Sequence, residues 1–389
     1  MVEDTISIYI HFPWCIKKCY YCDFNSYAIN KEIPEQKYIE RLLIDFDASC
    51  EFAFSANKTK LTSIFFGGGT PSLLSAQSIA TILNHINKTF TFAPDLEITL
   101  EVNPATIEQD SMYNYKIAGI TRISLGAQSF QDDKLHILGR IHKACDIKLT
   151  LDKIIKTNFN SFNIDLMYGL PNQTISDALY DLNIAVYFDP LHISWYNLTM
   201  EPNTWFYTHP PALPNEDIMW EIYNCGLSEL GNKNYINYET SAFAQKNHYC
   251  RHNLNYWQYG DYLGIGPGAH SKITTFHNNQ MAADNITIKR LVKIKHPKTY
   301  LASIGNAAIV SQNILNKKEI IFEFMLNNLR LQQGFLQQDF CKKTACKIED
   351  IQGSLNIAVE KGLLEINKDI IKPTLLGRRF LNDLQELFL

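Results

Sequence analysis

The stretch YIHFPWCIKKCYYC, from Tyr9 to Cys22, places three cysteines within eight residues. Cys15, Cys19 and Cys22 follow one another with the spacing Cys-x3-Cys-x2-Cys. Their thiolates are soft ligands, which suit zinc and iron–sulfur centres. A structural zinc site normally takes four protein ligands, so the three cysteines leave one coordination position to be explained.

Two kinds of metal centre fit this loop. One is a closed zinc site in which His11 or another residue supplies the fourth ligand. The other is an iron–sulfur cubane, of which the loop ligates three irons and leaves the fourth open to a substrate. A zinc knuckle usually stabilises a small domain with a poor core, whereas this chain has 389 residues, 46% of them hydrophobic. The sequence therefore favours the cluster with one open iron.

The composition narrows the class of protein. A formal net charge of −4 gives no electrostatic footprint for nucleic acid. The first segment, MVEDTISIYI, is acidic and lacks the features of a signal peptide; no stretch approaches the roughly 20 apolar residues of a transmembrane helix. Nine cysteines then fit metal binding or catalysis better than disulfide bonds. We therefore expect a cytoplasmic protein.

Short β-branched or aromatic runs alternate with longer helical patterns up to about residue 197. This alternation predicts an α/β fold, with a parallel sheet of about six strand–helix units and the helices packed outside. Two of the expected helices cover 35–52 and 75–90. The expected strands are SIYIHF (7–12), TSIFFGGG (62–69), LEITLEVNP (96–104), RISLGAQSF (122–130), SFNIDLMYG (161–169) and HISWYNLT (192–199).

Single polar residues stand at or just beyond the ends of these strands. Glu101, Gln128 and Asp165 occupy positions where a core strand would carry Val or Ile. In an α/β barrel the C-terminal strand ends form the mouth of the active site. We therefore expect these side chains to converge there.

After residue 200 the alternation stops. A Pro-rich turn and an aromatic, Gly-rich run follow, and from about residue 317 the order of helices and a strand–turn–strand unit is that of a winged helix. The expected domains are the barrel core (1–200), a barrel extension (201–275), a linker (276–316) and a small, mostly helical, winged-helix-like domain (317–389).

The loop CIKKCYYC, together with FFGGGTPS after the second strand, resembles the radical S-adenosylmethionine (SAM) superfamily. The resemblance implies a partial (β/α)6 barrel and a [4Fe–4S] cluster on Cys15, Cys19 and Cys22. It also implies that SAM chelates the open iron and is cleaved to methionine and a 5′-deoxyadenosyl radical. A substrate at the open iron explains the missing fourth ligand.

The resemblance gives roles to the polar strand-end residues. Glycines let the backbone approach the methionine end of SAM, Arg140 suits its carboxylate and Glu101 its amino group. Gln128 and Asp165 suit the ribose, and Tyr21 the adenine. The expected SAM-binding residues are Tyr9, Tyr21, Gly68, Gly69, Thr70, Glu101, Gln128, Arg140 and Asp165.

Further motifs resemble one branch of this superfamily, which contains oxygen-independent coproporphyrinogen III dehydrogenase and a haem chaperone. They are YIHFPWC, GGGTPS, EVNP, SLGAQSF, DLMYGLP and DYLGIGPGAHS. Three features favour the chaperone. Phe24 stands where the dehydrogenase has a further cysteine, and only fourteen residues precede Cys15, where the dehydrogenase has an N-terminal extension. HNLNYW (252–257) also matches the chaperone's His-Asn-x-x-Tyr-Trp motif.

HNLNYW offers an axial ligand for haem iron and aromatic surface for the porphyrin. Taken alone, these six residues fit ordinary packing better, and it is the match to the family motif that favours haem binding. No Cys-x-x-Cys-His attachment motif occurs in the sequence. The expected haem-binding residues are His252, Asn253, Tyr256 and Trp257, with Cys250, His248 and His270 as nearby alternatives.

The interpretation is a haem chaperone that carries a [4Fe–4S] cluster and a SAM site and hands haem to acceptor haemoproteins, respiratory enzymes among them. It needs an electron donor, has no nucleic-acid partner and no transmembrane segment, and leaves peripheral membrane contact open. No catalytic residue is assigned, and SAM cleavage stays open. One alternative is a dehydrogenase that converts coproporphyrinogen III to protoporphyrinogen IX; another is a DNA-binding regulator with a redox-sensing cluster.

Overall fold

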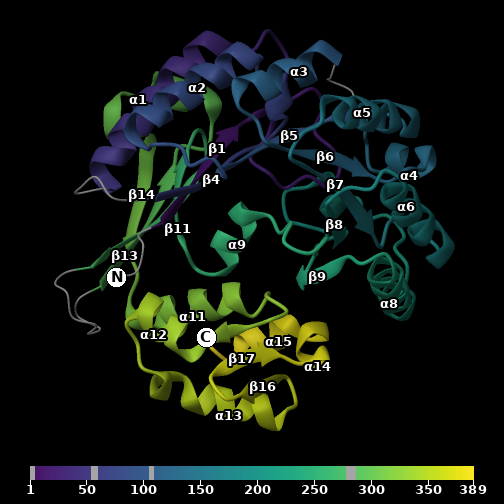
Figure 1. Cartoon of the computed structure of the whole chain (residues 1–389), viewed down its shortest axis with the longest axis vertical. Coiled ribbons are helices and arrows are strands. Elements are labelled where there is room, and N and C mark those ends of the chain that lie inside the picture. Colours follow the sequence, from purple (N-terminus) through teal and green to yellow (C-terminus); the bar gives the residue numbers. More distant parts are fainter. Residues whose placement is uncertain (1–4, 54–59, 105–108, 277–285) are drawn as a thin grey trace.

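One curved sheet runs through the upper two thirds of the molecule (Figure 1). The computed structural model describes residues 5–53, 60–104, 109–276 and 286–389. Within these ranges seven neighbouring strands run parallel. In spatial order they are β11 (Asp261–Ile265), β1 (Thr5–Phe12), β4 (Lys60–Gly68), β5 (Glu97–Val102), β6 (Arg122–Gln128), β7 (Ser161–Tyr168) and β8 (His192–Asn197).

Helices cover the convex face of the sheet (Figure 1). Local signals start them: the Ser75 hydroxyl accepts from Ser78 N, and Thr174 and Asp177 form a capping box, both of which satisfy free N–H groups of a first turn. The covering helices are α1 (Glu35–Ala53), α2 (Ala76–Thr89), α3 (Gln109–Ala118), α5 (Ala144–Thr157), α6 (Ile175–Tyr187) and α8 (Glu216–Asn232). Together with the parallel strands, they confirm the predicted α/β architecture.

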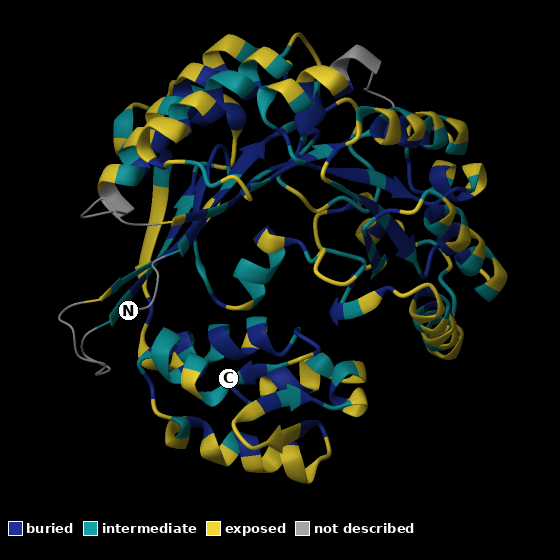
Figure 2. Cartoon of the chain, in the orientation of Figure 1, coloured by how far each residue is buried: buried dark blue, intermediate teal, exposed yellow. Residues whose placement is uncertain are grey.

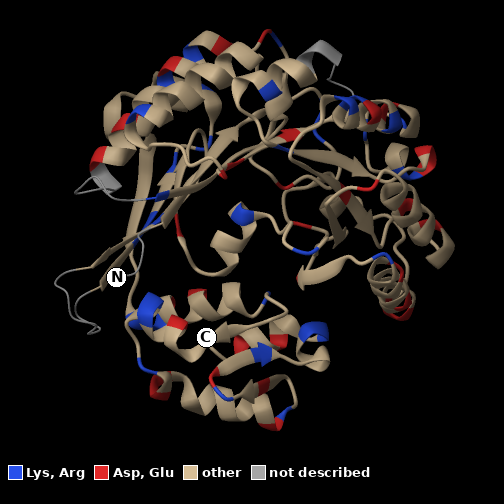
Figure 3. Cartoon of the chain, in the orientation of Figure 1, with Lys and Arg blue, Asp and Glu red and all other residues tan. Residues whose placement is uncertain are grey.

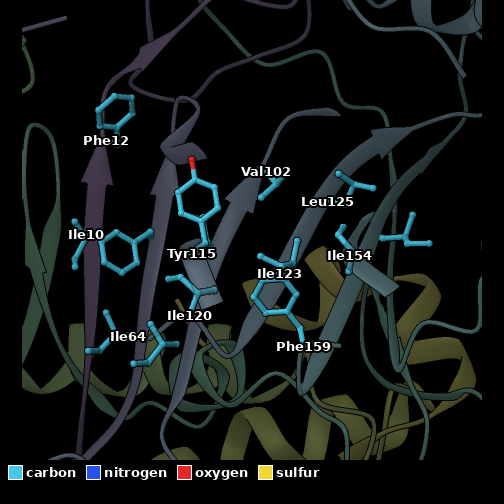
Figure 4. Close-up of a cluster of buried hydrophobic side chains, with 14 of the residues drawn as sticks. Ile10, Phe12, Ile64, Val102, Tyr115, Ile120, Ile123, Leu125, Ile154 and Phe159 are labelled. Atoms are coloured by element: carbon cyan, nitrogen blue, oxygen red, sulfur yellow. The ribbon is translucent and has the colours of Figure 1, made fainter. Parts of the chain in front are cut away.

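Side chains alternate between the two faces of the parallel strands. On the outer face Ile10, Ile64 and Ile123 are fully buried in the apolar core under the helices (Figure 4). On the inner face the same strands carry buried polar residues, such as Ser7 and Ser63. Parallel strands with both faces covered are normally apolar throughout, so the polar inner face is not a plain hydrophobic core.

Antiparallel strands extend the sheet at both ends. Beyond β11 lie β12 (His270–Phe276), β13 (Ile286–Lys293) and β14 (Ile309–Ile314); beyond β8 lie β10 (Ala242–Ala244) and β9 (Ile236–Glu239). The segment 276–316, expected to be a linker, therefore contributes two strands and α10 (Pro297–Ala302). The β13 sequence ITIKRLVK mixes apolar and basic residues, which an antiparallel strand with one solvated face accommodates.

The last part of the chain forms a second, smaller core under the sheet (Figures 1 and 2). Helices and a three-stranded sheet in the order β15–β17–β16 give it a winged-helix-like form, and acidic and basic residues are interspersed over its surface (Figure 3). Its elements are α11 (Lys317–Asn328), β15 (Phe335–Leu336), α12 (Gln337–Thr344), α13 (Gln352–Glu360), β16 (Leu364–Asn367), β17 (Ile370–Pro373), α14 (Leu375–Arg379) and α15 (Leu381–Glu386).

One short helix, α9 (Arg251–Trp257), lies inside the arc of the sheet and next to the C-terminal domain (Figure 1). It contains the HNLNYW segment and contacts β1, β4 and α11. The remaining short helices are α4 (Asp132–Ile137) and α7 (Trp205–Thr208). No described helix combines the length and apolar character needed to cross a bilayer.

Candidate functional site

The cysteine loop starts where β1 ends and is closed by a small two-stranded sheet, β2 (Trp14–Cys15) with β3 (Tyr27–Ala28). Cys15, Cys19 and Cys22 all line one cavity of about 400 Å³, which we name the first cavity. Among the residues that the structure describes, no group of three or more His, Cys, Asp or Glu side chains is arranged to hold a metal ion. What the loop provides is three sulfurs on one cavity wall.

These thiols and their surroundings fit an iron–sulfur cluster. Burial, with the neighbouring Cys22 and Cys19, raises the pKa of the Cys15 thiol to about 11, and burial raises the pKa of Cys22. Arg140 Nη1 donates to Cys19 Sγ at 3.4 Å. Metal ligation removes thiol protons, and the negative charge left on sulfur is stabilised by a fixed guanidinium.

His11 does not complete a zinc site with these cysteines. Its Nδ1 lies 3.0 Å from Tyr9 Oη and its Nε2 lies 2.9 Å from the carbonyl oxygen of Asn25. Both ring nitrogens are therefore engaged elsewhere, and His11 lines a different cavity. His11, which the sequence suggested as the fourth ligand of a zinc site, is therefore not placed to serve as one.

The glycine run fastens the end of β4 to the cysteine loop. Gly69 N donates to Phe12 O at 2.7 Å, and Thr70 N donates to Trp14 O at 2.8 Å. A Cβ added to Gly69 would lie 2.4 Å from Trp14 O, so only glycine permits this approach. Gly68, Gly69 and Thr70 also line the first cavity. The close backbone contact that Gly69 permits is with the cysteine loop.

Gln128 and Arg140 line the first cavity with buried atoms that have no partner in the described chain. These atoms are Gln128 Oε1 and Arg140 Nε. Arg140 is otherwise fixed by a 2.9 Å hydrogen bond from Nη2 to Gly126 O. Gln128 has a φ of +66°, which strains a non-glycine backbone by about 1–3 kcal/mol. Since buried polar atoms are normally hydrogen-bonded, both side chains are suited to a polar ligand.

Glu101 and Asp165 place two carboxyls on the wall of the same cavity. Glu101 Oε2 accepts from Gly68 N at 3.1 Å, and Asp165 accepts from Ser124 Oγ at 3.0 Å and from Asn163 Nδ2 at 2.8 Å. Burial and the charge of Asp165 raise the pKa of Glu101 to about 8, and burial raises the pKa of Asp165. A ligand with a cationic amino group and hydroxyl donors matches this pair.

A second cavity, of about 860 Å³, lies on the inner face of the sheet. It shares wall residues with the first cavity, including Gly68, Glu101, Ser124 and Asp165, so the two cavities adjoin. The α9 residues on its wall are His252, Asn253, Tyr256 and Trp257. The sequence-predicted SAM and haem residues thus lie around neighbouring spaces.

His252 is held as a neutral imidazole with a fixed tautomer. Its Nδ1 lies 3.1 Å from Ser63 Oγ, and Ser63 donates its own proton to Ser7 Oγ at 2.8 Å. Ser63 can then only accept, so Nδ1 carries the proton and Nε2 keeps its lone pair. Burial and the charge of Arg122 lower the pKa of His252 to about 3. A neutral imidazole with a fixed second nitrogen is the form that ligates metal.

Aromatic rings surround His252 and continue along α9. Phe65 lies with its ring centroid 5.0 Å from that of His252. Tyr256 stacks on Tyr262 at 4.2 Å, and its hydroxyl donates to Tyr262 Oη. Trp257 lies under the Arg330 guanidinium at 4.3 Å. Among the described residues His252 Nε2 has no hydrogen-bond partner, so the cavity wall combines this imidazole nitrogen with extended aromatic surface.

The other candidate residues are dispersed. Cys250 Sγ lies 3.5 Å from Glu97 Oε1, and burial raises the pKa of the Cys250 thiol to about 12. Neither Cys250 nor His248 is among the described residues that line the two cavities. His270 lines the second cavity. Of the two tyrosines expected at SAM, Tyr21 lines the first cavity and Tyr9 the second.

Several polar residues on the inner face of the strands were not predicted from the sequence. Arg122, Ser124, Asn163 and Ser194 line the second cavity and alternate with outward-facing apolar residues. The signal was a period of two within β6 and β7, where a doubly covered parallel strand would be apolar on both faces.

Comparison with known proteins identifies the family. Residues 9–183 match the Radical SAM superfamily and residues 315–380 match the HemN C-terminal domain. Curated proteins named "Heme chaperone HemW" from Haemophilus influenzae and Escherichia coli are 46% and 41% identical, over 99% of this chain and 98% of each relative. The chain belongs to the HemW family.

A solved structure agrees with the HemW assignment at the level of the fold. Coproporphyrinogen III oxidase (HemN) from Escherichia coli matches with a TM-score of 0.81 at 22% identity, over 99% of this chain and 90% of that one. At this identity the likeness shows the fold alone. It confirms the predicted partial barrel with its C-terminal domain, and the HemW relatives confirm the branch that the motifs indicated.

Proposed function

We propose that this chain binds haem in the second cavity, with His252 Nε2 as axial ligand, and transfers it to acceptor haemoproteins. The observation that carries the proposal is the neutral His252, which holds its Nδ1 against Ser63 and faces a cavity of about 860 Å³. The name of the relatives, Heme chaperone HemW, supports the same function.

The first cavity suits the cofactors of the superfamily. Cys15, Cys19 and Cys22 would hold a [4Fe–4S] cluster, which supplies an electron for SAM cleavage when both are bound. Arg140 would bind the SAM carboxylate through its free Nε, and Glu101 the amino group, where the cation lowers its raised pKa. Gln128 and Asp165 would bind the ribose. The cluster requires an electron donor; the acceptors of haem would include respiratory enzymes.

A haem titration tests the first part. The full chain should develop a Soret band that saturates near one haem per chain, since HNLNYW occurs once. His252→Ala should shift the band and weaken binding, whereas His270→Ala, which changes another histidine on the same cavity wall, should preserve it. If the Soret band is unchanged in His252→Ala but shifts in His270→Ala, His270 is the axial ligand instead. Loss of haem from the loaded chain to an apo-haemoprotein, followed by its absorbance, tests transfer.

Calorimetry on cluster-loaded protein tests the cofactor site. SAM binding should weaken in Asp165→Ala and in Arg140→Ala, because each removes a polar group from the first cavity. Asp95→Ala, which changes an exposed carboxylate just before β5, serves as the control. Unchanged affinity in both cavity variants would contradict the placement.

Dehydrogenation of a porphyrinogen is the second candidate, because the shared wall of the two cavities puts a bound tetrapyrrole beside the SAM site. Abstraction requires near-attack geometry. Phe24, which stands where the dehydrogenase has a further cysteine, lines both cavities. We expect no conversion of coproporphyrinogen III to protoporphyrinogen IX. Anaerobic product chromatography decides this, and SAM-dependent protoporphyrinogen formation would favour the enzyme.

A further inference from the structure

The guanidinium of one buried arginine in the second cavity has no hydrogen-bond partner among the residues that the structure describes. Arg122, the first residue of β6, is 4% exposed and lines this cavity. Within the described ranges its guanidinium makes no hydrogen bond and no ion pair, whereas the Arg140 guanidinium binds Gly126 and Cys19 and the Arg290 guanidinium binds Glu323. A buried charge is normally paired, so the Arg122 guanidinium is suited to an anionic group of a ligand in the cavity that it lines.

The nearest acidic groups are already engaged with other donors. Glu97 accepts from the backbone N–H groups of Arg251 and His252 at 3.2 Å each. Asp165 accepts from Ser124 and Asn163. Both carboxylates interact electrostatically with Arg122, and in the described part of the chain neither forms the bidentate pair that a guanidinium favours.

The wall of the second cavity is divided by polarity. Phe65, Tyr256 and Trp257 supply aromatic surface, while Arg122, Ser124, Asn163 and Ser194 supply a polar floor. Glu101 and Asp165 also line this cavity, and burial raises the pKa of both carboxyls, which favours their neutral forms. His252 stands close enough to both for the Arg122 charge to act on its imidazole. A ligand that fills this space has an apolar body, a group for the imidazole and an anionic edge.

We propose that Arg122 binds a propionate carboxylate of the tetrapyrrole, with the macrocycle against the α9 aromatics and the acid edge on the polar floor. This inference rests on the proposed haem binding and adds the orientation of the ligand. A planar carboxylate fits the guanidinium fork with two parallel hydrogen bonds. The contact between the propionate and Arg122 thus determines which edge of the macrocycle points into the barrel.

The test compares haem with its dimethyl ester, which lacks both carboxylate charges and keeps the iron and the ring. The full chain should bind haem roughly 10- to 100-fold more tightly than the ester, as one charge-assisted contact implies. In Arg122→Gln the preference should fall to near unity, with ester affinity unchanged. Arg122→Lys keeps the charge without the fork and should retain part of the preference.

Arg251→Gln is the matched control, because it removes a neighbouring charge that pairs with Asp95 outside the cavity; it should keep the full preference for haem. A preference for haem that survives in Arg122→Gln overturns the inference while haem binding stands. Failure of the unmodified chain to bind either porphyrin overturns the proposed function itself. Loss of ester binding in Arg122→Gln would show a damaged cavity and also contradict the assigned role.

Discussion

The imidazole Nδ1 of His252 lies 3.1 Å from the hydroxyl oxygen of Ser63. This contact ties a helix of the barrel extension to β4, and Ser63 passes the hydrogen-bond chain on to Ser7 of β1 at 2.8 Å. The barrel strands, rather than α9 alone, therefore set the direction in which Nε2 points.

Ser63→Ala should weaken haem binding by roughly 10-fold, because partners that orient a ligating histidine are commonly worth 10- to 100-fold in metal affinity. The imidazole would lose both its orientation and its fixed tautomer. Haem titration checks the affinity, and the ligand-field bands check the coordination. Ser7→Ala, one step further along the chain, should have a smaller effect; equal affinities in all three chains would contradict the relay.

Glu101→Gln should change the pH dependence of stability. The pKa of Glu101 is raised from the ordinary 4.5 to about 8 by burial and by Asp165. The folded chain thus holds a proton that the unfolded chain loses, so this carboxyl makes stability fall as pH rises from about 4.5 to 8. At a value of about 1.4 kcal/mol per pKa unit, the variant should gain about 2–5 kcal/mol over the original chain at pH 9.

Urea unfolding of the metal-free chain at pH 5 and pH 9 measures this difference. The two chains should have similar free energies of unfolding at pH 5, where the side chain is protonated in the folded state, which makes that pH the internal control. Parallel pH profiles for the two chains would show that Glu101 ionises normally.

Gly69→Ala should reduce both stability and the iron content after anaerobic reconstitution. The added Cβ would meet Trp14 O at 2.4 Å, so β4 and the cysteine loop must separate. Gly231→Ala is the matched control, since nothing lies within 4 Å of its added Cβ in α8; there alanine should stabilise the helix by about 0.5–1 kcal/mol. Full iron loading in Gly69→Ala would show that the loop does not depend on this approach.

Arg330 and Trp257 should be energetically coupled across the contact between the C-terminal domain and α9. The guanidinium lies 4.3 Å from the ring centroid, and partly desolvated cation–π pairs contribute about 0.5–2 kcal/mol. A double-mutant cycle with Arg330→Met and Trp257→Leu, followed by urea unfolding, measures the coupling. Additive effects would mean that the two parts of the chain are held together elsewhere. Haem titration of Arg330→Met then reports whether the C-terminal domain affects the second cavity.

Local patterns predicted much of the fold. The expected helix at 35–52 became α1 (Glu35–Ala53), and the one at 75–90 became α2 (Ala76–Thr89) with Ser75 as its cap. The pairing of strands that are far apart in the sequence could not be predicted from local patterns. The insertion of β11 beside β1 joins segments about 250 residues apart, and neither segment alone indicates its partner. Within 276–316, β13 pairs with β12 and with β14, and the sequence of this segment did not indicate those partners either.

The candidate site was predictable where chemistry is concentrated in the sequence. The spacing of Cys15, Cys19 and Cys22 predicted a metal centre. The structure places these cysteines on one cavity wall with Gln128 and Arg140. The position of a single side chain was harder to predict. An arginine that opens a strand is typical of a solvated strand end, so the burial of Arg122 became evident only once the concave face of the sheet was known.

The position of β1 between β4 and β11 has a consequence for the order of events during synthesis. The cysteine loop is synthesised before β11, yet Asn25 at its end donates to Pro267 O and to Lys295 O, both at 2.9 Å. These acceptors are made more than two hundred residues later. Pairing over such a separation is slow, because a large loop must close first. We therefore expect nascent chains that end before residue 260 to expose three unligated thiols, and cluster insertion to follow completion of the barrel.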